Sequence, residues 1–300
     1  MRTLTALVKR NMKLFFKDKG MFFTSLITPI ILLVLYATFL GNVYEDSFRS
    51  ALEEAGAMAS DALIDGCVGG ELISSLLAVC SVTVAFCSNM LMVQDKVSGA
   101  RRDLTISPVK KSTMALGYYI ATLFSTLLVC YAATGICLLY LSQVGWYLTV
   151  ADVLCIFLDV LLLVLFGTAL SSIINCFLSS QGQISAVGTI VSAGYGFICG
   201  AYMPISQFSD GLQKVISFLP GTYGTSLLRN HTMCGVFEEM ESQGFPVEVM
   251  EAIKDSVDCN IYFFGDKVEM NMMYLILVGT VVGLLIIYVL LNVLRSGKQR

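Results

Sequence analysis

The acidic side chains within apolar stretches are the first residues of this sequence that could do chemistry. Asp152 and Asp159 are seven residues apart, so both lie on one face of a helix, with Asp159 about two turns deeper. An ionisable group inside a membrane is a functional candidate. We expect Asp159 to make an interhelical hydrogen bond or to face a polar cavity. Glu71 and Asp152 are expected near the outer ends of their helices, within reach of water.

No other group of residues has the spacing of a catalytic or metal site. His231 is the single histidine, and no two of the ten cysteines form a CxxC pair. Cys234 and Cys259 lie in a hydrophilic segment and could form a disulfide in an oxidising exterior. The sequence has no GxxxxGK[ST] loop, so ATP, if it is used, must be bound by another polypeptide. We therefore expect no catalytic residue, metal or cofactor in this chain.

The composition indicates that the elements holding these residues cross a membrane. Hydrophobic residues make up 56% of the sequence and charged residues 14%, where a soluble domain has about a quarter charged. A soluble protein needs a polar shell, whereas a lipid-facing surface does not. Six apolar runs are long enough to cross about 30 Å of hydrocarbon as helices. These runs are residues 21–40, 67–93, 114–141, 153–178, 184–202 and 272–294.

The distribution of basic residues predicts the orientation. Most of the 19 Lys and Arg precede the first run, lie between the second and third, or follow the last. These segments share one side of the membrane only if the number of spans is even, and the positive-inside rule makes that side the cytoplasm. We therefore expect one all-α integral membrane domain, residues 1–300, with six transmembrane helices in the cell membrane and both termini cytoplasmic. We expect its basic face to contact the lipid membrane and not nucleic acid.

Two basic segments stand out on the predicted cytoplasmic side. Residues 1–20 divide into an apolar half and a basic half, which favours a helix in the membrane interface over a merely basic tail. The basic half comprises Lys9, Lys13 and Lys17, with Arg10 beside them. Residues 94–111 are the longest cytoplasmic loop. They fit either a short helix that ends at a proline or a solvated loop.

A ladder of small residues marks the fifth run. Its members are Gly188, Ser192, Gly196 and Gly200, at every fourth position. Small residues in a row allow helices to approach closely, within the chain or in a second subunit. The ladder therefore predicts tight packing of this helix.

The long segment 203–271 is expected outside the membrane, in two parts. The first part has apolar residues at helical spacing, which predicts a short amphipathic helix on the outer membrane surface before the last span. The second part, residues 238–269, is acidic and is expected to lie in water as a cap.

The sequence resembles, over nearly its whole length, the permease subunits of type 2 ABC exporters. Four features match in order along the chain. They are the basic amphipathic elbow, the loop QDKVSGARRDLTISPVKKS at 94–112, the short turn SSQGQ at 179–183, and the segment from GAYMP at 200–204 to LPGTY at 219–223.

The resemblance implies that two such domains pair, as a homo- or heterodimer, and that each docks on a cytoplasmic ATP-binding subunit carrying ATP and Mg. The loop would sit in a groove of that subunit and transmit its closure, with the elbow beside the contact. By analogy, the coupling residues are Asp95, Lys96, Gly99, Arg101, Arg102, Leu104 and Pro108. The cavity between the paired domains would be walled by the first, second and fifth runs, with Ser88, Asn89 and Ser192 as lining candidates.

Two other classes of membrane protein remain as alternatives. An ion-coupled carrier needs deep ionisable residues and usually a repeated half, and only Asp159 fits that pattern. A membrane-embedded transferase needs clustered acids or histidines at the interface, and the sequence has no such cluster. An ATP-binding partner would separate the exporter from both.

Overall fold

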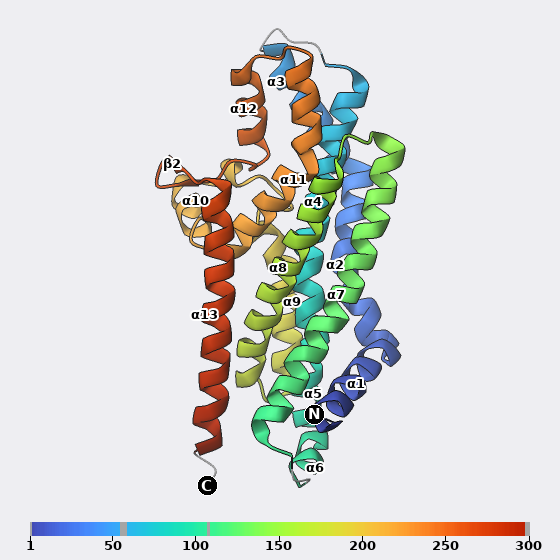
Figure 1. The fold of residues 1–300 in the computed structure, drawn as a ribbon, viewed down its shortest axis with the longest axis vertical. Helices are drawn as coiled ribbons and strands as arrows, with labels where there is room; N and C mark the ends of the chain where they lie inside the picture. Colours follow the sequence, from blue (N-terminus) through green and yellow to red (C-terminus); the bar gives the residue numbers. More distant parts are fainter. Residues whose placement is uncertain (1, 55–58, 107–108, 298–300) are drawn as a thin grey trace.

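The computed structural model describes residues 2–54, 59–106 and 109–297. Its body is a bundle of long helices that run roughly along one axis, with short helices packed at both ends (Figure 1). In chain order the elements are α1 (Arg2–Lys17), α2 (Lys19–Leu35), the π-helix η1 (Tyr36–Leu40), α3 (Gly41–Glu54), α4 (Asp61–Asn89), α5 (Leu91–Val97), α6 (Ala100–Ile106), α7 (Lys111–Val144), α8 (Val150–Phe177), α9 (Gln181–Ile198), the 3₁₀ helix η2 (Ile205–Gln207), α10 (Asp210–Ile216), α11 (Pro220–Ser242), α12 (Val247–Ser256), β1 (Tyr262–Phe263), β2 (Asp266–Lys267) and α13 (Met270–Gly297).

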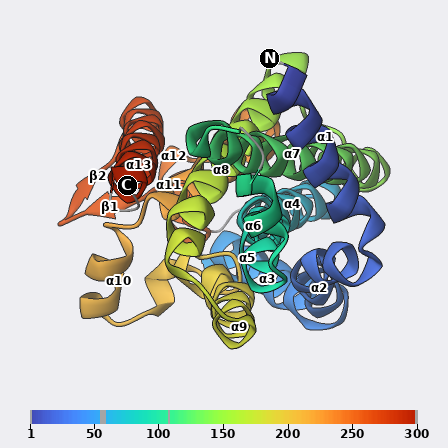
Figure 2. The same cartoon turned by 90° about the horizontal axis from the view of Figure 1, so that it is seen from below.

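Five helical segments of the described chain are long and apolar enough to cross a membrane. They are Lys19–Ser50, Asp61–Val97, Lys111–Val144, Val150–Phe177 and Met270–Leu294. Most of the apolar window of α4 is buried inside the protein, whereas little of that of α13 is buried. Accordingly, α4 lies inside the bundle and α13 at its edge (Figure 2). These five segments coincide with five of the six expected spans.

The sixth expected span corresponds to α9, which is not among those five segments. At 1.5 Å per residue its 18 residues extend about 27 Å, close to the hydrocarbon thickness. Gly, Ser and Gln dilute its apolar residues, which lowers its mean hydropathy.

Residues 41–54, which include four acidic residues, continue the helix of the first apolar run. α2, η1 and α3 follow one another without a break. The π-turn adds a residue per turn and so resets which residues face inward. Tyr44, Phe48 and Leu52 then recur at helical spacing on the buried face of α3.

The cap expected over 238–269 is built from the end of α11, from α12 and from a hairpin. In the hairpin Tyr262 pairs with Lys267 and Phe263 with Asp266. The cap shares a hydrophobic core with α3 and the N-terminal part of α4, to which Phe48, Met240 and Ile253 contribute. Apolar packing, and not the acidic surface alone, holds this part of the chain together.

The amphipathic outer segment is shorter than its apolar spacing suggested, with η2 followed by the seven-residue α10. Leu212, Val215 and Phe218 of this segment are exposed, as expected for side chains that face lipid or an interface.

Helix α11 is the main element that the apolar pattern did not indicate. It is buried on nearly all sides along its first part, although its sequence mixes Thr, Ser, Arg and His with apolar residues. Small residues allow it to approach α4 closely. A Cβ at Gly70 of α4 would lie 2.7 Å from the Met233 side chain and 3.1 Å from the Thr232 carbonyl oxygen of α11.

Candidate functional site

The loop at 94–111 folds into two short helices joined by a tight turn. α5 ends at Val97, and α6 begins at Ala100. Gly99 in the turn has φ +84°, a backbone conformation that glycine adopts without steric cost. Pro108, another predicted coupling residue, lies outside the described residues. Of the two alternatives for this segment, a short helix or a solvated loop, the structure shows helix, as a pair of short helices with a glycine corner.

Asp95 ties the loop to the elbow and to α7. Its carboxylate accepts hydrogen bonds from Arg10 Nη1 at 2.7 Å, Arg10 Nη2 at 3.1 Å and Tyr118 Oη at 2.5 Å. The hydrogen bond to Asp95 raises the pKa of Arg10 above its ordinary value. Asp95 is buried, so this carboxylate faces the protein and positions the loop. Arg10 was expected on the basic face of residues 1–20. It turns toward the bundle instead, because it pairs with Asp95.

Lys96 fastens the same loop to the end of α8. Its Nζ donates to three backbone carbonyls, those of Asn175 at 2.7 Å, Cys176 at 3.1 Å and Leu178 at 3.1 Å. The last carbonyls of a helix lack partners within the helix and carry partial negative charge, so a lysine stabilises them. The two neighbouring residues 95 and 96 therefore connect the loop to α1, α7 and α8.

The remaining coupling candidates face outward to different degrees. Arg102 is exposed, Arg101 is half-buried, and Leu104 packs partly against a cluster between α7, α8 and α13. Two apolar side chains of the loop are also exposed, Val97 at 47% and Ile106 at 80%. Basic and apolar groups thus share the outer surface of this helical pair.

The elbow α1 lies across the loop end of the bundle, beside α7 (Figure 2). Leu7 and Phe15 are buried, whereas Lys9, Lys13 and Lys17 are exposed. The expected division into an apolar and a basic face is therefore present in the fold.

A cavity of about 880 Å³ lies between α2, α4 and α9, the first, second and fifth expected spans. Thr24, Thr28, Met90, Gln94 and Ser192 are among its lining residues. The walls are mainly apolar, with a few hydroxyl and amide groups and the carboxylate of Asp18, which is the usual composition of a small-molecule site.

Two members of the small-residue ladder, Gly188 and Ser192 of α9, line this cavity, in place of a tight contact along a second long helix. A Cβ at Gly188 would lie 2.7 Å from the Met90 side chain, and one at Gly196 would overlap the Tyr202 ring. Gly200, at φ +76°, ends the ladder in a turn. The predicted close packing is therefore local, against individual side chains.

Two cavity candidates lie elsewhere. Asn89 is buried in the bundle, where its Nδ2 donates to Ser171 Oγ at 3.0 Å and Ser172 Oγ at 2.9 Å. Ser88 faces a small void between α1, α4 and α7. Neither residue lines the α2–α9 cavity, because these positions point toward other helices.

Asp159 makes the expected interhelical hydrogen bonds and does not line that cavity. Its Oδ2 lies 2.6 Å from His231 Nδ1 on α11, and its Oδ1 accepts from Tyr274 Oη on α13 at 2.7 Å. The residue is fully buried. It therefore joins α8, α11 and α13 through a local network.

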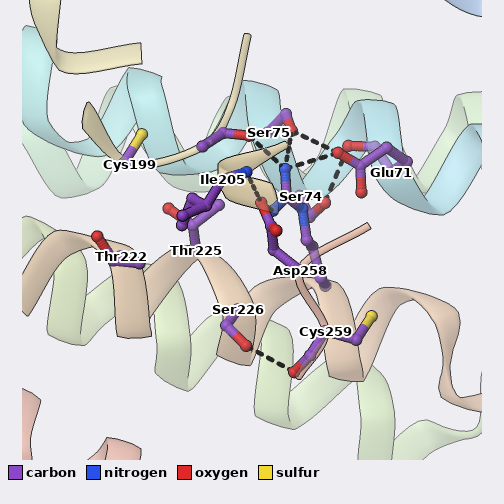
Figure 3. A network of polar contacts seen from close by, with 12 residues as sticks. Glu71, Ser74, Ser75, Cys199, Ile205, Thr222, Thr225, Ser226, Asp258 and Cys259 are labelled. Carbon is purple, nitrogen blue, oxygen red and sulfur yellow. Dashed lines mark hydrogen bonds and ion pairs between the residues drawn. The ribbon is translucent and has the colours of Figure 1, made fainter. Parts of the chain in front are cut away.

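A second buried network holds together the half of the bundle that carries α12, and sequence reasoning missed its central residue. Arg229 of α11 donates from Nη2 to Glu71 Oε1 at 2.7 Å and to the Gly200 carbonyl oxygen at 2.6 Å, and from Nη1 to Asp258 Oδ2 at 3.1 Å. Figure 3 shows Glu71, Ser75 and Asp258 converging in this network. The expectation that water reaches Glu71 was wrong: its side chain is 1% exposed, because α11 covers it.

The proposed disulfide is not formed in the structure. Cys234 and Cys259 are both free thiols. Cys259 is buried, and its carbonyl oxygen accepts from Ser226 Oγ at 2.8 Å and Asn230 Nδ2 at 2.7 Å. Cys234 is half-buried and contacts Glu238 one turn along α11. The two cysteines thus lie in different surroundings.

The comparisons with known proteins identify the family. The model of the ABC-2 type transporter family matches residues 2–232, which include the elbow, the α5–α6 pair, the α2–α9 cavity and most of α11. A search of curated proteins gave no match. Since the family match covers most of the sequence, the chain belongs to the ABC-2 type transporters, as a permease subunit of a type 2 ABC transporter.

Proposed function

We propose that this chain is the membrane-spanning subunit of an ATP-driven exporter. It would act in the cell membrane, with both termini in the cytoplasm and α9 as the sixth span. ATP and Mg would be bound by a separate cytoplasmic subunit, which docks on the α5–α6 pair. A second copy or a homologous permease would complete the transporter and face the cavity between α2 and α9.

The anchoring of the α5–α6 pair carries this proposal. Asp95 and Lys96 link the pair to α1, α7 and α8 through direct hydrogen bonds. A force applied to the pair would therefore move these helices together, as a rigid-body transition requires. The exposed Arg102 and Ile106 leave a surface of mixed basic and apolar character for a partner.

In this proposal the cavity between α2 and α9 holds the substrate during the transition. Its walls belong to α2 and α9 at the edge of the bundle and to α4 at its centre. ATP-driven closure would shift the population between two arrangements of paired subunits and so alternate the side to which the cavity opens.

The test is capture of an ATP-binding subunit from native membranes with a tag on the C-terminus. Wild type is compared with Arg101→Glu/Arg102→Glu, which reverses charge on the outer face of the α5–α6 pair. The matched control is Lys17→Glu/Lys19→Glu, which makes the same change in charge at two exposed positions near the start of α2. All three proteins must be extracted in equal amounts with equal gel-filtration profiles.

We expect wild type and the control to retain a polypeptide with a GxxxxGK[ST] motif, and the loop variant to lose it. Retention by all three proteins would move the docking surface away from α6. If stably extracted wild type captures no ATP-binding subunit, the proposed function is refuted.

A further inference from the structure

We propose that a groove between α7 and α13 binds an anionic phospholipid from the leaflet nearest the α5–α6 pair. The groove has a volume of about 830 Å³, within the range of ordinary ligand sites. It is separate from the cavity described above: no described residue lines both, and α7 and α13 lie across the bundle from α2 and α9 (Figure 2). The proposal does not depend on an ATP-binding partner.

The walls of the groove suit an acyl chain. Leu116 of α7 and Val289 and Val293 of α13 are exposed there, at 46%, 58% and 61%. Its floor is fixed by Tyr288, whose hydroxyl donates to the Ala115 carbonyl oxygen at 3.0 Å. The contact holds α13 against α7 at one point and leaves the apolar channel beside it. Because these helices cross the membrane, the channel is in contact with the hydrocarbon region.

The end of the groove nearest the α5–α6 pair suits a phosphate headgroup. Lys110 and Lys111 line it there, both exposed, with the Ser112 hydroxyl beside them. No Asp or Glu occurs among the described residues that line the groove. The site therefore joins a basic mouth to an apolar channel, and charge complementarity selects an anionic lipid over a neutral one.

Tyr119 adds an independent indication of a ligand. It lines the groove and is 7% exposed, and its hydroxyl has no hydrogen-bond partner in the described part of the chain. Buried hydroxyls are usually paired. A lipid ester or phosphate oxygen in the groove would provide an acceptor for it.

The test uses fluorescence quenching by brominated lipids. The sequence has one tryptophan, Trp146, which is replaced by Phe to remove the background. Val289→Trp then reports from the groove, and Ile286→Trp, at an exposed position of α13 that does not line the groove, reports on bulk lipid. Each protein is placed in phosphatidylcholine vesicles with increasing fractions of dibrominated phosphatidylglycerol or of dibrominated phosphatidylcholine.

We expect the Val289→Trp reporter to be half-quenched at a lower fraction of the anionic lipid than of the neutral one. The ratio of the two half-quenching fractions, neutral over anionic, should be roughly fivefold for each lysine. Lys110→Gln/Lys111→Gln should abolish it, whereas Lys17→Gln/Lys19→Gln should retain it. The Ile286→Trp reporter should respond equally to both lipids.

Three results would overturn the proposal. Equal quenching by both lipids at the groove reporter would show an unselective lipid contact. The same anionic preference at both reporters would show a general surface-charge effect. Weak quenching by both lipids would show that protein, such as a second copy of the chain, covers the groove. Gel filtration of each variant before reconstitution excludes misfolding as the cause.

Discussion

Replacement of Arg229 by Met should severely destabilise the half of the protein that carries α12. The arginine side chain is 1% exposed and makes ion pairs with Glu71 at 2.7 Å and Asp258 at 3.1 Å. Methionine fills a similar length but leaves two carboxylates buried without their counter-charge. Breaking a buried ion pair from one side costs about 3–5 kcal/mol.

This cost is measurable as a change in melting temperature of the detergent-extracted protein. At about 2–4 °C per kcal/mol, a loss of this size lowers the melting temperature by roughly 6–20 °C. The matched control is Arg49→Met, which removes an exposed arginine that also contacts two carboxylates, Glu45 and Asp61. Solvent screens that group, so we expect no measurable change.

A triple variant tests the cause. Arg229→Met combined with Glu71→Gln and Asp258→Asn removes the uncompensated charges and keeps the side-chain volumes similar. Most of the lost stability should return, because a neutral buried site has no ionic desolvation cost to repay. Either of two results would refute the reasoning. One is that Arg229→Met and the Arg49→Met control have the same melting temperature. The other is that the triple variant has no higher melting temperature than Arg229→Met.

Three further predictions concern the other contacts. Asp95→Asn removes the half-buried ion pair with Arg10, so the free energy of unfolding should fall by about 1 kcal/mol. The melting temperature of the extracted protein should then fall by a few degrees. An unchanged melting temperature would show that the pair does not stabilise the fold. Gly99→Ala forces a side chain into the left-handed region at a cost of about 1–2 kcal/mol, and less ATP-binding subunit should be captured per extracted permease; full capture would show that the turn tolerates strain. Asp159→Asn, which removes the charge facing His231, should destabilise the protein by at least as much as Asp95→Asn in the same melting assay, since its site is fully buried; a smaller effect would contradict a structural role for this cluster.

The sequence predicted the parts of the fold that depend on long apolar runs. Those runs located five segments that the structure confirms as long, apolar helices, and the division of charges in residues 1–20 matches the two faces of α1. Both features follow from the free energy of transferring side chains to lipid or water, which adds up residue by residue within a segment. Each feature can therefore be predicted from its own segment alone.

The elements that were missed depend on contacts between distant segments. α11 is buried although its residues are mixed in polarity, because Thr, Ser and Arg side chains find partners on α4 and in the cap. Glu71 was expected to be near water because nothing in its own segment reveals that Arg229, 158 residues away, covers it. An arginine in a segment otherwise poor in charge was the one signal that could have located this network.

The contacts of the loop residues also could not be predicted from the sequence. Spacing and resemblance selected Asp95 and Lys96 as members of the coupling loop, but only the fold shows that both side chains turn toward the bundle. The direction of a side chain in a short helix depends on its neighbours in space, which the loop sequence alone does not specify.

The central claim is that the outer face of the α5–α6 pair docks an ATP-binding subunit. The most direct measurement places a photo-crosslinking amino acid at Ile106, the 80% exposed apolar residue of α6, in cells that carry the native partners. Val150, 79% exposed at the start of α8 and at the opposite end of α7 from α6, receives the same amino acid as control. The account predicts that position 106 captures a polypeptide with a GxxxxGK[ST] motif and that position 150 does not. Capture of no such polypeptide at position 106, or equal capture at both positions, would contradict it.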